Sequence, residues 1–238
     1  TARLPLNGLY IIAHVFALLM YLLPSSFKRI SRINLKLVYP QLCPKQHKLL
    51  LKSTLKNQCF TYMESVKCWG MPKAYNLNLI KQVEGEHLLL EALSTKKGGI
   101  IVVTHFGCWE ILNVWLNQYV QPMVMYKPNK NKALDKFIFQ ARQNFNSILV
   151  PTDAIGVSAI FKHLKRGGVT MILPDHLPKP SGGIYAHFFE QDVLCGTLVS
   201  KLAQKTQCEV IGVSCVRQKS GFNIVCQAMH TDIRGKDL

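Results

Sequence analysis

The segment that most constrains the fold of this chain is Gly98–Glu110, with the sequence GGIIVVTHFGCWE. Its apolar, β-branched run, Ile100–Thr104, is typical of a buried strand. The run ends at His105, and Gly107 then allows the backbone to turn into a helix predicted over Cys108–Gln118. A histidine is therefore expected where a strand ends and a helix begins, which is the edge of an open α/β sheet at which ligands bind.

A carboxylate is expected close to this histidine. Glu110 follows His105 after four intervening residues, so its side chain could reach back from the first helical turn to an imidazole nitrogen. That contact would fix the tautomer of the ring and leave the other nitrogen as a general base. The same pattern also fits a histidine satisfied within a loop and a glutamate that only complements the helix dipole. The spacing alone leaves both interpretations open.

Around this segment, strand and helix patterns alternate. Helices are predicted over Glu86–Lys96, Cys108–Gln118, Lys132–Phe145, Ile155–Lys165 and Gly196–Thr206. Strands are predicted over Ile100–Thr104, Met123–Tyr126, Ser147–Val150, Val169–Leu173, and, as a pair around a turn, Val210–Val216 and Phe222–Cys226. Such alternation predicts an α/β fold with a mixed central sheet and helices on both sides.

The N-terminus carries a long apolar run. Leu6–Leu23 contains no formal charge, and as a helix it would reach about 27 Å, close to the thickness of a bilayer's hydrocarbon core. Residues 25–70 then hold nine Lys or Arg and one acid, Glu64, which by the positive-inside rule places them on the cytoplasmic side. We predict a membrane anchor over residues 1–24 and an α/β domain over 25–238, beginning with a basic helical segment over 25–70. A signal peptide and a buried core helix fit the same run.

The net charge indicates an anionic partner. The chain has 29 Lys and Arg against 13 Asp and Glu, a net charge of +16. Part of the excess forms a stripe at helical spacing next to the apolar run: Lys45, Lys48, Lys52 and Lys56. This stripe is expected to lie against anionic membrane headgroups, or else to be a solvated helix face. A nucleic-acid partner is not expected, because no zinc knuckle, RNP-like strand or recognition helix is found in the sequence.

The cysteines indicate neither a metal site nor a disulfide framework. Eight are present, none at C-x-x-C spacing, and several lie in apolar runs, which predicts reduced and mostly buried thiols in a cytosol-facing protein. Cys108 has a second interpretation, because the start of a helix favours a thiolate. A thiol-dependent hydrolase or transferase, with Cys108 paired to His105, is therefore one alternative function. A membrane-anchored module that binds polyanions is another.

Several blocks of the sequence resemble a known family. HFGCWE resembles the His-x4-Asp/Glu motif of the glycerolipid acyltransferase superfamily, and more narrowly the HFGNWE form of the late (lauroyl/myristoyl) acyltransferases of lipid A biosynthesis. Further blocks are similar to that family in the same order, from about Leu22 to about Val216: LPSSFKRISRINLKLVYPQL, MYKPNKNKALDKFIFQAR, PDHLPKPSGGIYAHFFE and CGTLVSKLAQKT. Departures from the family pattern include Cys108 in place of Asn and His176 in place of Gln.

The resemblance implies a reaction and two catalytic residues. It implies transfer of a fatty acyl group from an acyl carrier protein thioester to a hydroxyl of a phosphorylated lipid A precursor, with no metal or cofactor. The catalytic domain would lie on the cytoplasmic face of the inner membrane. In this scheme His105 acts as the general base, and Glu110 orients the ring and compensates its charge.

Three further residues are predicted to contact substrate. Arg142 matches an arginine of the family and is expected to bind a phosphate or the charge of the transition state; the alternative is a surface ion pair with Asp135. Asp175 is expected at the same sheet edge as His105 if the two strands are parallel, where it could position Arg142 or a sugar group, or be only a turn residue. Lys179 is expected to meet a phosphate, because a compact ammonium suits a point charge.

Overall fold

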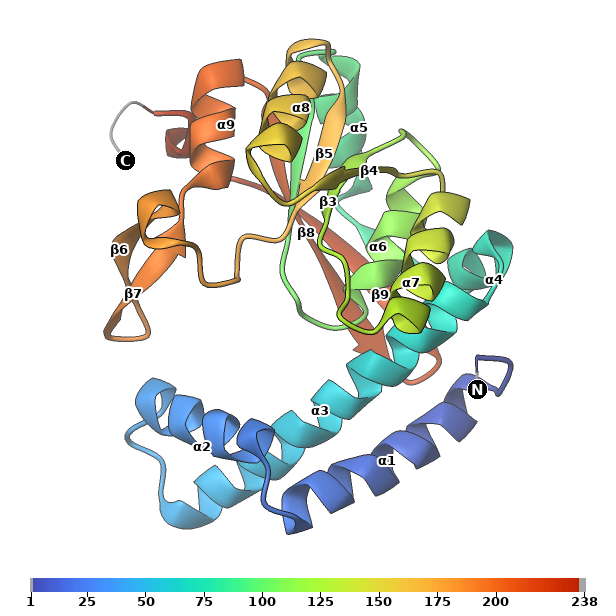
Figure 1. Cartoon of the computed structure of the whole chain (residues 1–238), viewed down its shortest axis with the longest axis vertical. Coiled ribbons are helices and arrows are strands. Elements are labelled where there is room, and N and C mark those ends of the chain that lie inside the picture. Colours follow the sequence, from blue (N-terminus) through green and yellow to red (C-terminus); the bar gives the residue numbers. More distant parts are fainter. Residues whose placement is uncertain (1, 236–238) are drawn as a thin grey trace. The chain divides into compact units, whose positions relative to one another are not determined.

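The chain folds into two compact units. The computed structural model describes residues 2–235. The first unit comprises Thr1–Gly70 and Tyr185–Val193, and the second comprises Met71–Ile184 and Leu194–Leu238. Figure 1 labels the elements of both units along the chain.

Three helices make up most of the first unit: α1 (Leu6–Leu22), α2 (Ser26–Val38) and α3 (Pro44–Gly70). Helices α1 and α3 lie side by side (Figure 1), and α2 packs against α3. Ala13 and Ala17 on α1 meet Cys59 and Phe60 on α3 in a small apolar core. Glu64 is buried in this unit and accepts a hydrogen bond from the Tyr10 hydroxyl at 2.7 Å. The predicted basic segment is thus helical.

The predicted anchor is not shown as one membrane-crossing helix. Among residues 2–235, no single helix has both the length and the hydropathy for a membrane span; α1 and α2 meet these criteria only as a pair, bent by 80°. The bend has a local cause, since Pro24 cannot donate the next helical hydrogen bond. Ser25 then caps a new helix by accepting a hydrogen bond from the backbone N–H of Lys28 at 3.2 Å.

A seven-stranded mixed sheet organises the second unit. Its strands are β1 (Ile80–Glu84), β2 (Gly99–Val103), β3 (Met123–Tyr126), β4 (Ile148–Pro151), β5 (Val169–Ile172), β8 (Glu209–Gln218) and β9 (Gly221–Ala228). Their order across the sheet is β1-β9-β8-β2-β5-β3-β4. The five strands from β8 to β4 are parallel, and β8 pairs with β9 in the antiparallel sense. The predicted mixed sheet is confirmed.

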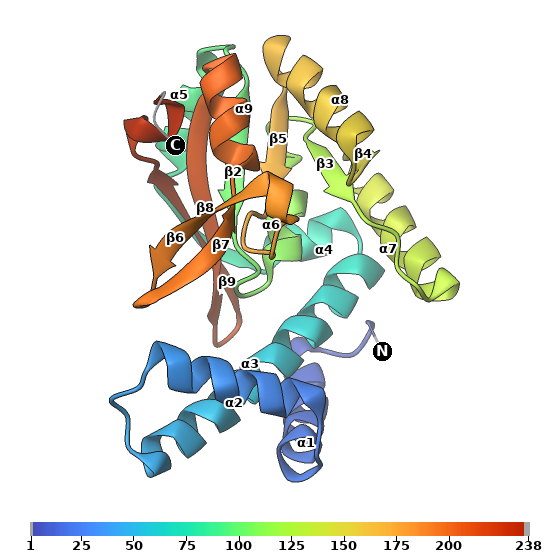
Figure 2. The ribbon, with the colours of Figure 1, turned by 60° about the vertical axis from the view of Figure 1, so that its left-hand side comes forward.

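Helices flank both faces of this sheet. They are α4 (Lys73–Asn78), α5 (Glu86–Ser94), α6 (Trp109–Leu116), α7 (Lys132–Asn144), α8 (Ala154–Lys165) and α9 (Leu198–Thr206). Helices α8 and α9 share one apolar core with β2, in which Ile100 contacts Leu164 and Leu202 among others. Helices α5 and α6 pack behind the sheet against β8 (Figure 2). Because side chains alternate along a strand, Ile100 and Ile101 of β2 are buried on opposite faces.

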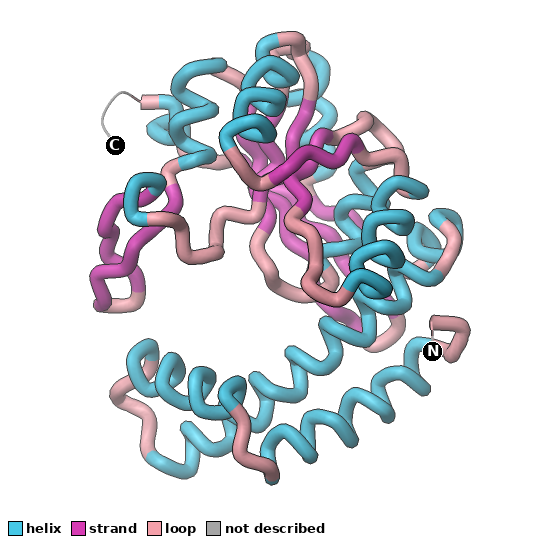
Figure 3. The backbone as a smooth tube through the Cα atoms, in the orientation of Figure 1, coloured by secondary structure: helices cyan, strands magenta, loops and turns pink. Residues whose placement is uncertain are grey.

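Helix α4 was not predicted, and neither were two features of the strands. One is β1, whose sequence IKQVE has few apolar residues because the strand lies at the edge of the sheet. The other is the hairpin of β6 (Gly183–Phe188) and β7 (Gln191–Gly196), which forms a separate two-stranded sheet, visible in Figure 3. Two short 3₁₀ helices, η1 (Pro180–Gly182) and η2 (Thr231–Arg234), complete the described chain.

Candidate active site

His105 and Asp175 meet at the carboxyl edge of the large sheet. Strands β2 and β5 are parallel neighbours, with Val102 opposite Ile172. His105 lies three residues after Val102, and Asp175 lies three residues after Ile172. The pairing therefore brings the two residues to equivalent places at the same edge, as predicted for Asp175 if the strands are parallel.

The Asp175 carboxylate holds His105 at two points. Its Oδ2 accepts a hydrogen bond from the backbone N–H of His105 at 2.8 Å, and its Oδ1 lies 2.7 Å from Nδ1 of the ring. Because a carboxylate only accepts hydrogen bonds, this contact assigns the proton to Nδ1 and leaves the lone pair on Nε2. Burial alone would raise the pKa of Asp175, but the hydrogen bonds from His105 outweigh it and lower that pKa below its usual value.

Two aromatic rings fix the plane of the imidazole. The Trp109 ring meets His105 edge to face at 5.2 Å between centroids, and the His176 ring stacks on it at 4.2 Å with 21° between the planes. The His105 side chain is still 31% exposed. The imidazole is thus oriented by its neighbours and remains open to a substrate. His176 is the residue that stands where the resembling family has Gln.

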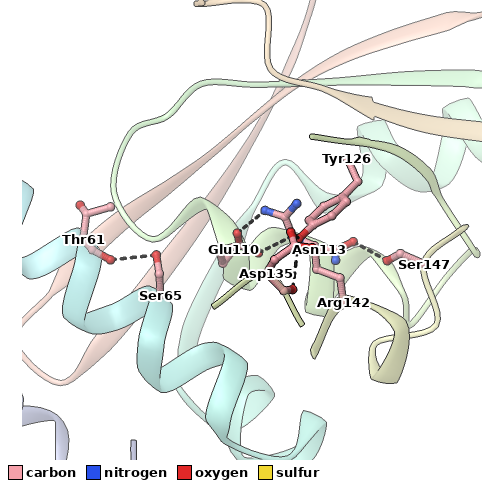
Figure 4. Close-up of polar contacts among 8 residues, drawn as sticks. All are labelled: Thr61, Ser65, Glu110, Asn113, Tyr126, Asp135, Arg142 and Ser147. Carbon is pink, nitrogen blue, oxygen red and sulfur yellow. Dashed lines mark hydrogen bonds and ion pairs between the residues drawn. The ribbon is translucent and has the colours of Figure 1, made fainter. Parts of the chain in front are cut away.

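Glu110 makes a different pair from the one that its spacing suggested. It lies on α6, is 0% exposed, and faces Arg142 on α7 (Figure 4). Arg142 Nη2 lies 2.5 Å from Glu110 Oε1, and Arg142 Nε lies 3.3 Å from Oε2, so the contact is bidentate. The carboxylate beside the His105 ring is therefore that of Asp175. The alternative interpretation, an ion pair of Arg142 with Asp135, is not formed among the described residues, since Asp135 accepts from Tyr126 instead.

Trp109 links the His105–Asp175 pair to the Arg142–Glu110 ion pair. The guanidinium of Arg142 lies 5.3 Å from the Trp109 ring centroid and 5.5 Å from that of Tyr126, both within the range of cation–π attraction. The same Trp109 ring contacts His105. Desolvation, followed by the hydrogen bond to Asp135, raises the pKa of Tyr126 to about 12. Tyr126 therefore stays protonated and ties β3 to α7.

Three polar side chains of the second unit form a hydrogen-bonded cluster that connects α6 to the start of β4. Ser147 donates a hydrogen bond to Asn113 Oδ1 at 2.8 Å, which Figure 4 shows, and accepts one from Asn117 Nδ2 at 3.1 Å. Both asparagines belong to α6 or its end, and Ser147 directly precedes β4. The Asn113 and Ser147 side chains are buried, so these bonds satisfy polar groups that water does not reach, and they hold α6 against the sheet.

The turn after His105 depends on glycine. Gly107 has φ +60°, and a Cβ there would lie 2.0 Å from the carbonyl oxygen of Cys215 on β8. Only glycine permits both that conformation and that approach. The turn leads to Cys108, which is 1% exposed. None of the eight cysteines forms a disulfide, and six are buried, in agreement with the sequence prediction.

The remaining predicted site residue stands apart from this cluster. Lys179 is exposed just before η1, and no hydrogen bond or ion pair of its ammonium is found within residues 2–235. In that described range, no group of three or more His, Cys, Asp or Glu side chains is arranged to hold a metal ion. The polar groups that the described residues do bring together are an oriented imidazole and an arginine held by a buried carboxylate.

Comparison with known proteins places these residues in a family context. A family model described as bacterial lipid A biosynthesis acyltransferase matches residues 1–237. The chain is 22% identical over 200 residues to the lipid A biosynthesis palmitoleoyltransferase of Escherichia coli (strain K12), and equally to the lipid A biosynthesis acyltransferase of Shigella flexneri. Each alignment covers 82% of this chain and 64% of the relative. The chain thus spans somewhat less than two thirds of the length of these curated relatives.

Proposed function

Because the chain belongs to the family of bacterial lipid A biosynthesis acyltransferases, we propose that it transfers a fatty acyl group to a hydroxyl of a phosphorylated lipid A precursor. The donor in this proposal is the thioester of an acyl carrier protein. The observation that carries the proposal is the His105–Asp175 pair, an exposed imidazole held through Nδ1 at the edge of a parallel sheet.

The proposed reaction starts with the acceptor hydroxyl. Nε2 of His105 takes its proton while the hydroxyl oxygen forms a bond to the thioester carbonyl carbon. Asp175 keeps the ring in the correct tautomer and stabilises the imidazolium that results, as in the triad logic of serine hydrolases, with the acceptor hydroxyl in the place of serine. Collapse of the tetrahedral intermediate breaks the carbon–sulfur bond, and the imidazolium returns its proton to the departing thiolate.

The oxyanion of that intermediate requires donors. Backbone N–H groups at the start of α6 are suited to it, since the helix begins four residues after His105 and its dipole is positive at that end. Arg142 supplies a positive charge for the oxyanion or for a substrate phosphate, and Glu110 positions its guanidinium. Glu110 meets Arg142 rather than the imidazole, so its catalytic role stays a prediction that would act through Arg142; contact of Lys179 with a phosphate also stays a prediction.

The first unit is proposed to hold the enzyme at the membrane that contains its acceptor. The outer face of α1 and one face of α2 expose apolar side chains, among them Ile11, Leu18, Leu22, Phe27 and Ile30. Basic residues flank these rows, so the unit suits the anionic surface on the cytoplasmic side of the inner membrane.

An acylation assay tests the proposal. With acyl carrier protein thioester and a tetra- or penta-acylated precursor, His105→Ala is expected to lower the rate by about 10²–10⁴-fold, the usual contribution of a general base. His187→Ala is the matched control, because His187 is also paired with an aspartate but is exposed in the β6–β7 hairpin. Equal rates for wild type and His105→Ala would refute the mechanism.

The thiol alternative is less well supported by the geometry. A nucleophile must reach the acyl carbon, and the Cys108 side chain is almost fully buried. We expect Cys108→Asn, which restores the residue usual in the resembling family, to keep acyl transfer. Loss of transfer in a folded Cys108→Asn protein would favour the thiol mechanism instead.

A further inference from the structure

A cavity of about 630 Å³ lies wholly within the first unit. Its volume falls in the range of roughly 300–1,000 Å³ that is typical of small-molecule sites. The wall is built by the end of α1, by α2, by the loop after α2 and by the first turns of α3. None of these residues belongs to the second unit, so the cavity is distinct from the His105 site.

One side of the cavity is basic. Arg32 and Lys36 lie one turn apart on α2, and Lys48 faces the same space from α3. Within residues 2–235, the side chains of these three residues form no ion pair and no hydrogen bond. The first unit has three acids: Glu64, which accepts from Tyr10, and Glu190 and Asp192 of the β6–β7 hairpin, where Asp192 lies beside His187. None of the three lines the cavity. Three cations therefore share one cavity without a countercharge, and a bound anion would relieve their repulsion.

Helix α3 reinforces this preference. It begins at Pro44 on the cavity wall, and the first turn of a helix carries a partial positive charge. Tyr21, also on the wall, has the ammonium groups of Lys28 and Lys52 over its ring, at 5.2 and 4.9 Å from the centroid. Positive charge therefore surrounds the cavity as well as lining it, because Lys28 and Lys52 lie just outside its wall.

The other side of the cavity is apolar. Leu42, from the loop after α2, and Leu51, which is buried on α3, line it together with the Tyr21 ring. An inorganic anion would satisfy the cations and leave this apolar wall unused. A molecule that joins an anionic headgroup to hydrocarbon matches both sides.

We propose that this cavity binds one anionic glycerophospholipid, with its phosphate between Arg32, Lys36 and Lys48 and the first part of its acyl chains along Leu42 and Leu51. A zwitterionic lipid fits less well, because its own cation would enter a cavity that already holds three. The proposal does not depend on acyl transfer, since its residues take no part in the proposed chemistry. Binding can therefore be measured whether or not the protein is active.

Titration calorimetry of the full chain in a neutral detergent tests the site. The probe is a short-chain phosphatidylglycerol below its micelle concentration, for which saturable binding of about one molecule per chain is expected. Short-chain phosphatidylcholine, inorganic phosphate and glucosamine 1-phosphate are expected to bind at least about tenfold more weakly. Equal or tighter binding of inorganic phosphate would refute the role of the apolar wall. Equal or tighter binding of glucosamine 1-phosphate would refute a glycerophospholipid as the occupant.

Matched variants separate a defined site from diffuse charge attraction. The triple change Arg32→Gln, Lys36→Gln and Lys48→Gln is expected to weaken phosphatidylglycerol binding by about tenfold or more. The control removes the same charge from the same two helices outside the cavity: Arg29→Gln, Lys45→Gln and Lys56→Gln. Equal losses in both variants would overturn the proposal.

A second variant keeps every charge. Leu42→Trp adds bulk at the cavity wall on a surface loop, so it is expected to reduce binding while circular dichroism stays unchanged. Full binding by Leu42→Trp would contradict the assigned position of the acyl chains. This variant also decides the question if the triple variant fails to fold.

Discussion

At the scale of single residues, the direction of proton transfer follows from one carboxylate. Asp175 accepts hydrogen bonds from both the backbone and the ring of His105, so the ring can neither rotate nor change tautomer without losing a charge-assisted bond. The basic nitrogen is consequently Nε2. The proposed reaction requires no thiol or hydroxyl nucleophile from the protein itself, because in it the acceptor lipid supplies the hydroxyl.

The first residue-scale prediction concerns this carboxylate. Asp175→Asn retains the shape but can donate a hydrogen bond to Nδ1, which would favour the wrong tautomer. The acylation rate is expected to fall by about 10²–10⁴-fold with little change in stability. Asp192→Asn serves as control, since Asp192 also lies beside a histidine, His187, but in the exposed hairpin. A loss of less than about threefold in Asp175→Asn would contradict the role of Asp175.

The second residue-scale prediction concerns the Glu110–Arg142 pair. Glu110 is fully buried and Arg142 is 13% exposed, so removing either partner leaves a desolvated charge. Glu110→Ala and Arg142→Leu are each expected to lower the free energy of unfolding by about 3–5 kcal/mol. The double variant is expected to cost about 1–3 kcal/mol less than the sum of the two.

Urea unfolding followed by tryptophan fluorescence measures this cycle, because Trp109 lies beside the pair. Additive losses would show that the two side chains do not support each other. The same unfolding measurement is needed to interpret activity. A Glu110 variant that loses acyl transfer has to be shown to be folded before a catalytic role is assigned to Glu110.

At the scale of elements, the loop between β2 and α6 decides how the His105 ring is presented. The loop leaves the sheet after Val103 and carries His105. At Gly107 its backbone comes close to the backbone of β8. The close approach of Gly107 to Cys215 pins the loop to the strand beside β2. Helix α6 then begins with Trp109, whose ring lies beside both His105 and Arg142.

This loop gives the element-scale prediction. Gly107→Ala places a Cβ against the carbonyl of Cys215 in a left-handed conformation, which by itself costs roughly 1–3 kcal/mol. Both the free energy of unfolding and the acylation rate are expected to fall. Gly182→Ala is the control, because no atom lies within 4 Å of the added Cβ and its φ is not positive. A wild-type rate in Gly107→Ala would mean that the loop can shift without effect.

At the scale of the whole molecule, charge is unevenly distributed along the chain. Residues 1–70 hold ten Lys or Arg against one acid, and the rest of the chain also has a basic excess. Under the proposed function, the basic excess of the first unit suits an anionic membrane surface, and that of the second suits an acidic donor protein. Such long-range attraction mainly accelerates encounter and is screened by salt.

The molecular-scale prediction follows from this screening. The KM for the acyl carrier protein thioester is expected to rise by about tenfold between low and high ionic strength. The KM for an uncharged acyl pantetheine thioester, which offers the same reacting group, is expected to stay constant. A flat response of the protein donor to salt would remove the electrostatic part of the proposal.

The sequence alone determined the local structure. The β-branched run before His105, the apolar spacing of α6 and the glycine between them predicted a strand, a turn and a helix, and β2 and α6 agree to within two residues at each end. These features depend on steric preferences and hydrophobic periodicity over a few neighbouring residues. The α/β class and the sheet-edge position of His105 could be predicted for the same reason.

Only the tertiary structure decided which side chains meet. Asp175 lies 70 residues from His105 and reaches it because β5, rather than another strand, is the neighbour of β2. Glu110, five residues from His105, instead turns toward Arg142, because α6 and α7 bury that pair together. The order of the strands and the partner of a buried charge both depend on how all the elements of the unit pack together. A buried charge must find an opposite charge in that packing, and residues far apart in the sequence decide whether it does. The side chains that contact His105 could therefore not be predicted from spacing.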